Sequence, residues 1–265
     1  MLSITDAQLN AWLAAAMFPL ARLLGLFAVA PVFSNRGAPA RVRLAAGLAV
    51  SLALLPALPP MPAIMPASGL GLAVFAQQIF IGIAIGFMLR IAFATVDMAG
   101  ALIGMQMGLS FAIFFDPDQG GQTAVLSDFL SLFTTLLFLA INGHLMLIEV
   151  LVRSFEWLPV STASLRVDGW SFVVHTGAGI FSTGLLISLP VIGVLLVANI
   201  SLGVLTRAAP QLNLFAVGFP ITLSAGLFSL LLIMSNFGAL LQTIFSRAIE
   251  ATGLMLEALS PLPMP

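Results

Sequence analysis

The feature that most constrains this chain is a series of long apolar stretches, six or seven in number, which fill most of its 265 residues. Hydrophobic residues make up 60% of the sequence and charged residues only 7%, whereas a soluble domain carries about 25% charged residues. Such a chain must sit in lipid, pack against other apolar chains, or do both. We therefore predict an all-α, polytopic integral membrane protein, with helices over residues 7–33, 44–55, 69–96, 98–115, 124–152, 171–205 and 214–247.

Charge and residue usage exclude several classes of function. The nine basic residues are all Arg and the net charge is −1, which gives no electrostatic basis for binding nucleic acid. The chain has no Cys, so disulfides, thiol catalysis and most zinc sites are excluded. It also lacks the sequence motifs of hydrolases, nucleotide-driven pumps and dinucleotide-binding enzymes. We expect a protein that is not an enzyme and that holds no metal and no cofactor.

The N-terminus is predicted to belong to the mature structure. The first ten residues contain an acidic residue and no basic one, unlike the basic start of a cleaved signal peptide. Thr5 followed three residues later by Gln8 predicts a capping box that opens the first helix.

The distribution of arginines predicts a topology. If all seven segments cross the membrane, one side holds Arg207 and the other side holds Arg36, Arg41, Arg43, Arg90, Arg153, Arg166 and Arg247. The positive-inside rule then places the N-terminus outside and the C-terminus inside. This count depends on the segment 44–55 crossing, and that segment is shorter than the ~20 residues that a span requires.

Glycine and proline positions predict close packing and breaks. Gly100, Gly104 and Gly108 share one helix face, which suits either a contact with another subunit or ordinary helix packing, two interpretations that we weigh equally. The run from Asp116 and Pro117 to Gly120 and Gly121 predicts a turn after that helix. Segment 171–205 is predicted to break at Pro190, and a turn is predicted over residues 207–213.

Two groups of residues are candidates for a functional site, and each has an ordinary structural explanation that composition alone favours. Polar residues in apolar segments suggest either a proton or ion relay or hydrogen bonds in a packed bundle; they are Arg22, Asp97, Asn142, His144 and Glu149. Asn142 and Glu149, seven apart, would share a face of one buried helix, with His144 elsewhere on it. Large apolar side chains before the turn suggest either a pore constriction or an ordinary helix end; they are Met105, Met107, Phe111, Phe114 and Phe115.

Four blocks of sequence resemble the FliR family of flagellar export proteins, which includes the T subunit of virulence type III secretion systems. The blocks are PVFSNRGAPARVR (31–43), IGMQMGLSFAIFFDP (103–117), NGH (142–144) and RAAPQLNLFAVGFP (207–220). The last block is long and specific, and the resemblance covers essentially the whole chain.

The resemblance implies a fold and an assembly. It implies long kinked helices and helical hairpins, with a FliP-like part over residues 1–170 and a FliQ-like part over 171–265. The hairpin would cover residues 171–250 and turn at Arg207, Pro210, Gln211 and Asn213. One copy would join FliP and FliQ, with FlhB and FlhA as further partners, in the bacterial inner membrane at the flagellar basal body.

The resemblance also implies a non-enzymatic function and reverses our interpretation of the apolar cluster. The family forms the export gate for unfolded flagellar proteins, and a loop that matches residues 106–122 plugs its closed pore. Phe111 and Phe114 would lie at the narrowest part, sealed with Met105, Met107 and Phe115. The turn made by Asp116, Pro117, Gly120 and Gly121 would act as the plug hinge.

Two rivals stay open. A virulence-type export subunit would share the fold and differ in its substrates. A proton-coupled carrier of small molecules would need binding groups in mid-membrane, and Asn142, His144 and Glu149 are its candidates.

Overall fold

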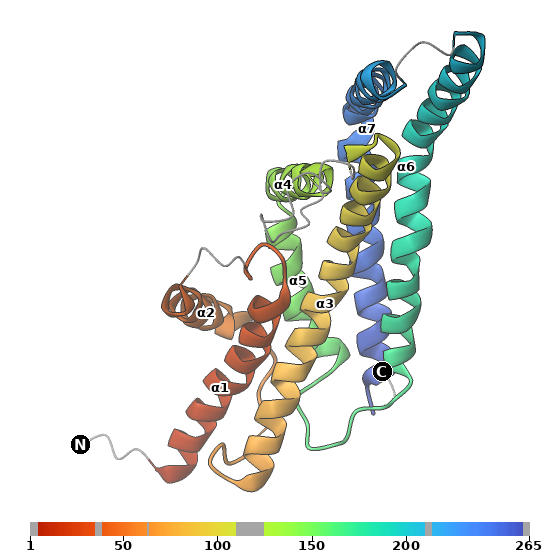
Figure 1. Cartoon of the computed structure of the whole chain (residues 1–265). Helices are drawn as coiled ribbons and strands as arrows, with labels where there is room; N and C mark the ends of the chain where they lie inside the picture. Colours follow the sequence, from red (N-terminus) through yellow and green to blue (C-terminus); the bar gives the residue numbers. More distant parts are fainter. Residues whose placement is uncertain (1–4, 35–38, 63, 110–124, 210–213, 262–265) are drawn as a thin grey trace. The chain divides into compact units, whose positions relative to one another are not determined.

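The described part of the chain is helical throughout. The structure, a computed structural model, describes residues 5–34, 39–62, 64–109, 125–209 and 214–261, and these contain no strand. The elements, drawn in Figure 1, are α1 (Asp6–Val29), α2 (Ala40–Leu54), the short 3₁₀ helix η1 (Leu55–Ala57), α3 (Gly69–Gln106), α4 (Val125–Ala140), α5 (Gly143–Trp157), α6 (Gly169–Ala208) and α7 (Leu214–Leu259). The prediction of an all-α protein is confirmed.

The predicted capping box opens α1. The backbone N–H of Gln8 donates to the Thr5 hydroxyl at 3.4 Å, and the backbone N–H of Thr5 donates to the Gln8 side chain at 3.2 Å. These bonds satisfy two of the backbone groups that the start of a helix leaves without partners.

Two predicted segments are one helix. α3 runs without interruption over 38 residues, so the predicted boundary between segments 69–96 and 98–115 is wrong. Only Asp97 suggested that boundary, and a single acidic residue does not break a helix whose flanking turns are apolar. Arg90 therefore lies within a helix and not in a loop, which removes the basis for the predicted N-out, C-in topology.

One predicted segment is instead two helices. The stretch 124–152 is divided into α4 and α5 at Asn142, whose φ of 59° is left-handed. Asn tolerates that conformation better than most residues because its short polar side chain bonds locally. Hydropathy does not detect such a break, because the residues on both sides of it remain apolar.

The last two helices are longer than predicted. α6 continues through Pro190, so the predicted break there is wrong; prolines are tolerated in membrane helices because neighbouring groups satisfy the freed backbone. α7 extends twelve residues beyond Arg247 to Leu259. This extension is amphipathic, with Glu250 and Glu257 exposed and Leu256 buried, and hydropathy therefore ended the segment too early.

Several helices can span a membrane. Within the described residues, five are long and apolar enough, and α4 with α5 makes a sixth if the broken pair counts as one span. The chain is thus a polytopic membrane protein, and the predicted count of seven spans is wrong because two of the seven segments form α3.

The described helices form two compact units. The first unit comprises residues 1–91, 142–177 and 245–265, and the second comprises residues 92–141 and 178–244. This division concerns packing within the chain. The division at residues 170 and 171 concerns likeness to FliP and FliQ, and it stays a prediction.

Candidate functional site

The first unit is organised around a buried arginine. Arg22 of α1 is fully buried, and all its polar partners are neutral. Its Nε donates to Oε1 of Gln78 on α3 at 2.8 Å. Its terminal nitrogens donate to the carbonyl of Ser154 at 2.8 Å and to that of Leu158 at 2.9 Å, and the guanidinium carbon lies 3.9 Å from the ring centre of Phe155. The guanidinium thus joins α1, α3 and the end of α5.

Glycines allow α1 and α3 to approach closely beside Arg22. A Cβ added to Gly82 of α3 would collide with the backbone carbonyl of Arg22, and one added to Gly25 of α1 would collide with that of Ile79. Backbone contact at both points leaves no space for a larger side chain. The role of Gly82 is visible only in the tertiary structure, because the backbone that it contacts belongs to a different helix, α1.

Arg22 is therefore part of a hydrogen-bonded bundle. Gln78 and Ser154 are its main side-chain partners, and sequence reasoning did not find either of them. They are separated from Arg22 by 56 and 132 residues. Neither spacing corresponds to a pattern within one helix, so the sequence carried no signal for the contact.

The polar residues around the α4–α5 break do not form a buried set. Asn142 precedes α5 in a left-handed conformation and is exposed, and His144 is half-buried. Glu149 is exposed and pairs with Arg153 one turn away at 2.7 Å. The predictions that all three are buried and that Asn142 and Glu149 share a face of one helix are wrong for this chain, because Asn142 interrupts that helix.

The glycines of the second unit pack α3 against α4. A Cβ on Gly100 would meet the backbone of Ser127, whose hydroxyl donates to the carbonyl of Asp97 at 2.8 Å. Gly104 of α3 faces Leu126 of α4. These contacts within one chain are the ordinary packing that we weighed against a subunit contact.

Gly108 does not share that face. It lies beyond the end of α3 with a φ of 82°, a conformation that glycine adopts without strain. The prediction that three glycines line one helix face is therefore wrong for Gly108, which helps the chain to leave the helix.

The start of the predicted plug loop rests on α7. Met107 is fully buried, and its side chain occupies the space over Gly226 of α7. Met105 is 58% exposed. The other predicted plug and hinge residues lie outside the described residues; they are Phe111, Phe114, Phe115, Asp116, Pro117, Gly120 and Gly121.

An apolar hollow of about 500 Å³ adjoins Met107. It is lined by residues that follow α3 and by side chains of α4 and α7, among them Leu109, Val125, Phe129, Leu227 and Met234. Leu109 and Val125 are the described residues on either side of residues 110–124, and both line this apolar hollow.

The two long helices are separated where a turn was predicted. α6 ends at Ala208 and α7 begins at Leu214. Arg207 belongs to the last turn of α6 and not to the turn itself, a position that favours a positive charge. Pro210, Gln211 and Asn213 lie outside the described residues.

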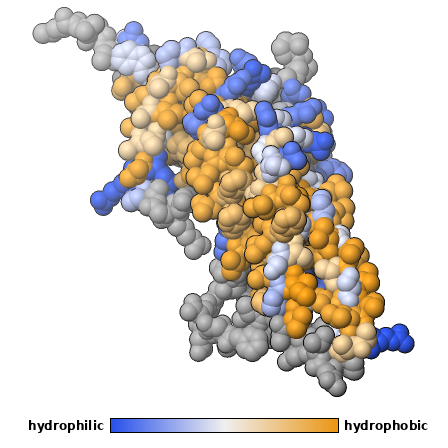
Figure 2. Space-filling model, turned by 90° about the horizontal axis from the view of Figure 1, so that it is seen from above, coloured by the Kyte–Doolittle hydropathy of each residue, from blue (hydrophilic) through white to orange (hydrophobic). Residues whose placement is uncertain are grey.

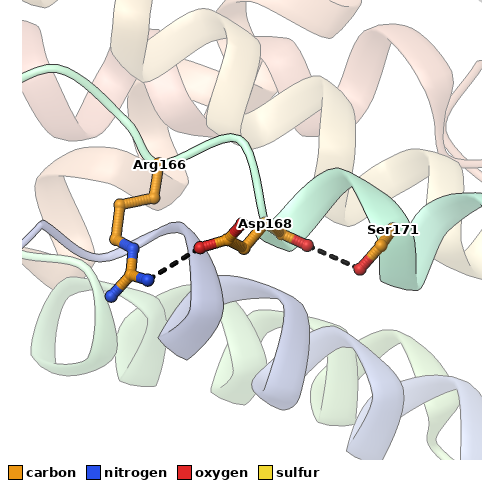
Figure 3. Close-up of polar contacts among 3 residues, drawn as sticks. All are labelled: Arg166, Asp168 and Ser171. Carbon is orange, nitrogen blue, oxygen red and sulfur yellow. Dashed lines mark hydrogen bonds and ion pairs between the residues drawn. The ribbon is translucent and has the colours of Figure 1, made fainter.

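Polar contacts fix the start of α6 in the first unit (Figure 3). Arg166 pairs with Asp168 at 2.7 Å, and the Ser171 hydroxyl donates to the carbonyl of Asp168 at 2.6 Å. The backbone N–H of Arg166 donates to the carbonyl of Leu259 at 3.1 Å. The end of α7 thereby holds the loop that leads into α6.

The described residues contain no group of three or more His, Asp or Glu side chains that could hold a metal ion. The structure therefore gives no candidate metal centre in that part of the chain, and the sites to explain are packing sites and apolar surfaces.

Comparison with known proteins decides the family. The family described as "Bacterial export proteins, family 1" matches residues 13–248. The flagellar biosynthetic protein FliR of Escherichia coli (strain K12) is 40% identical over 265 residues, which cover 100% of both chains. The chain belongs to the FliR family. FliR of Pectobacterium carotovorum subsp. carotovorum is 38% identical over 98% of this chain and 99% of its own length, and FliR of Caulobacter vibrioides is 32% identical over 82% and 86%.

Membership in the FliR family agrees with the architecture. The chain is a membrane-embedded protein of a flagellar biosynthetic export family, and its several apolar helices fit that class. The resemblance seen in the four sequence blocks is thus confirmed over the full length of the chain.

Proposed function

We propose that this chain is a non-enzymatic pore subunit of the flagellar type III protein export gate. In this proposal one copy assembles with FliP and FliQ, contacts FlhB and FlhA, and resides in the bacterial inner membrane at the flagellar basal body. Unfolded flagellar proteins pass through the assembled pore. The observation that carries the proposal is the 40% identity to the flagellar biosynthetic protein FliR of Escherichia coli over the entire chain.

The apolar surface supports an assembled state. In the most apolar 18-residue window of α3, 67% of the window is buried within the chain. The corresponding windows of α6 and α7 are each 28% buried. Apolar residues cover broad areas of the face shown in Figure 2. Such surfaces need lipid or other apolar chains to cover them, and partner subunits around a pore would provide that cover.

The proposed seal consists of apolar side chains of residues 105–115. Phe111, Phe114 and Phe115 follow shortly after α3 in the sequence, and Met105 is exposed at the end of that helix. Apolar side chains in a constriction exclude water and ions. Met107 is buried against α7, so we assign it to anchoring the start of the loop.

The rivals have less support. A carrier would need polar groups that converge, whereas Glu149 pairs with Arg153 at the surface and Asn142 lies at a helix break. The relatives from Escherichia coli and Pectobacterium carotovorum are both named flagellar biosynthetic protein FliR, which favours the flagellar system over its virulence counterpart.

Complementation tests the proposed function directly. The chain is produced in Escherichia coli lacking its own FliR, and swimming and secretion of flagellar proteins are measured. We expect both to be restored at least in part, with an empty vector as the control. If the chain accumulates in the membrane together with the host FliP and FliQ but secretion stays at the control level, the proposal is contradicted.

A leak measurement tests the seal separately. Replacing Phe111 and Phe114 by Ala is expected to increase ion leak in cells that make the assembled complex, because the smaller side chains leave the constriction open to water. Phe219→Ala with Phe228→Ala is a matched control, since both side chains are exposed on α7. An unchanged leak with intact assembly would remove these phenylalanines from the seal.

A further inference from the structure

α2 is the least buried of the apolar helices. Only 11% of its apolar window is buried, and Gly47 and Ser51 are its buried residues. Gly47 lies beside Leu24 and Phe27 of α1, within the same unit. The helix is therefore attached to the rest of its unit along one narrow line.

An arginine stands at the head of a leucine stripe on α2. Arg41 is followed by Leu44, Leu48 and Leu52, a spacing of three, four and four residues that places all four on one side of the helix. The three leucines are 54%, 48% and 51% exposed. The stripe thus combines a positive end with an apolar body.

Among the described residues, the arginines of α2, Arg41 and Arg43, form no ion pair. Between Asp6 and Asp97 the sequence contains no acidic residue and five Arg. Arg41 is exposed, whereas Arg43 is half-buried on the face of Gly47 and Ser51, and its Nε is buried without a hydrogen-bond partner. The first turn of a helix also disfavours positive charge, so this end of α2 is suited to an external anion.

Within the first unit, α2 is oriented differently from α1, which is a candidate membrane span. In Figure 1, α1 runs across the view while α2 is seen down its axis. Composition alone admits α2 with η1 as a candidate span. The 15 residues of α2 reach about 22 Å and the three residues of η1 add about 6 Å, against about 30 Å for the apolar part of a bilayer, so orientation and not length distinguishes a span from an interfacial helix. If α1 crosses the membrane, α2 lies close to the membrane plane.

We propose that α2 is an interfacial helix that binds anionic phospholipid. Its leucine stripe enters the acyl region, and Arg41 and Arg43 contact the negatively charged headgroups. The inference requires a membrane protein but does not depend on the pore function.

The depth of α2 is measured with spin labels. The chain has no Cys, so Leu44→Cys, Leu48→Cys and Leu52→Cys each provide one attachment point in the full chain. The labelled protein is placed in discs of phosphatidylcholine and phosphatidylglycerol at a ratio of about 3:1, chosen because anionic lipid attracts basic segments. We expect equal, shallow depths for the three labels. A steady increase in depth along the helix, or labels that neither lipid nor water reaches, would overturn the proposal.

Lipid selectivity tests the role of the arginines. A fluorescent label on Leu44→Cys reports contact with lipids that carry a quencher, either phosphatidylglycerol or phosphatidylcholine. We expect quenching to show a preference for phosphatidylglycerol of about fivefold per arginine near the surface. Arg41→Gln with Arg43→Gln should abolish the preference, and the Lys pair at the same positions should keep it. Arg207→Gln with Arg247→Gln, which removes the same charge from exposed sites on other helices, should also keep it. Equal quenching by both lipids in the parent chain, or an unchanged preference in the Gln pair, would refute the assignment.

Discussion

At the scale of single residues, Arg22 shows how a charge is accommodated inside an apolar unit. Its guanidinium is fully buried and satisfied by an amide, backbone carbonyls and a hydroxyl. An arginine suits this place because its planar group donates in several fixed directions at once. Removing it would leave the acceptors of Gln78 and Leu158 buried without donors, which is costly in a low-dielectric interior.

The first prediction is that Arg22→Ala lowers the stability of the full chain in detergent by about 3 kcal/mol, because buried acceptors lose their donor. The stability of Arg22→Lys should lie between those of the parent chain and Arg22→Ala, since one ammonium group cannot reach all the partners. Thermal unfolding measures both variants, with Arg247→Ala, at an exposed position, as the control. Equal midpoints for Arg22→Ala and that control would show that the hydrogen bonds of Arg22 add nothing to stability.

At the scale of elements, the helix boundaries depend on local backbone chemistry that hydropathy does not register. Asp97 leaves α3 intact, while Asn142 divides an apolar stretch into α4 and α5. The division between α4 and α5 rests on the left-handed conformation of Asn142, and replacing the side chain of this residue tests the division.

The second prediction concerns this break. Asn142→Val should destabilise the chain by roughly 1–2 kcal/mol, because a β-branched residue disfavours a left-handed conformation. Asn142→Gly should be neutral or slightly stabilising, since glycine adopts that conformation freely. Thermal midpoints and swimming in the complementation strain provide the measurements. A Val variant as stable as the Gly variant would mean that the helix runs through residue 142.

The third prediction tests the extension of α7 beyond Arg247. Leu256 is fully buried and Leu254 is 46% exposed, so the two leucines form a matched pair on one helix. Leu256→Ala should cost at least ~2 kcal/mol, the lower limit for a buried leucine, whereas Leu254→Ala should cost much less. Equal losses of thermal stability in the two variants would argue against the described packing of this segment.

At the scale of the whole molecule, the chain buries too little of its apolar surface to be self-sufficient in water. α2, α6 and α7 carry most of the exposed leucine, valine and phenylalanine side chains. In the proposed assembly, FliP and FliQ cover part of this surface and lipid covers the rest.

The fourth prediction follows from that surface. Co-production with FliP and FliQ from the same organism should raise the amount of folded chain in the membrane several-fold over production alone, because uncovered apolar faces favour aggregation. Size-exclusion chromatography in mild detergent measures the folded fraction, and an unrelated polytopic protein serves as the co-production control. A chain that is monomeric and stable alone, with no gain from these partners, would weaken the assembly proposal.

The sequence by itself determined the class of the protein, its family and one helix start. An apolar content of 60% with few charges indicates a membrane-embedded helical fold, and the capping box at Thr5 depends on residues three apart. The tertiary structure decided the rest. The union of two segments in α3, the partners of Arg22 and the contact of Met107 with Gly226 depend on residues that are distant in the sequence. No local pattern encodes such contacts, because they arise only when helices pack against one another.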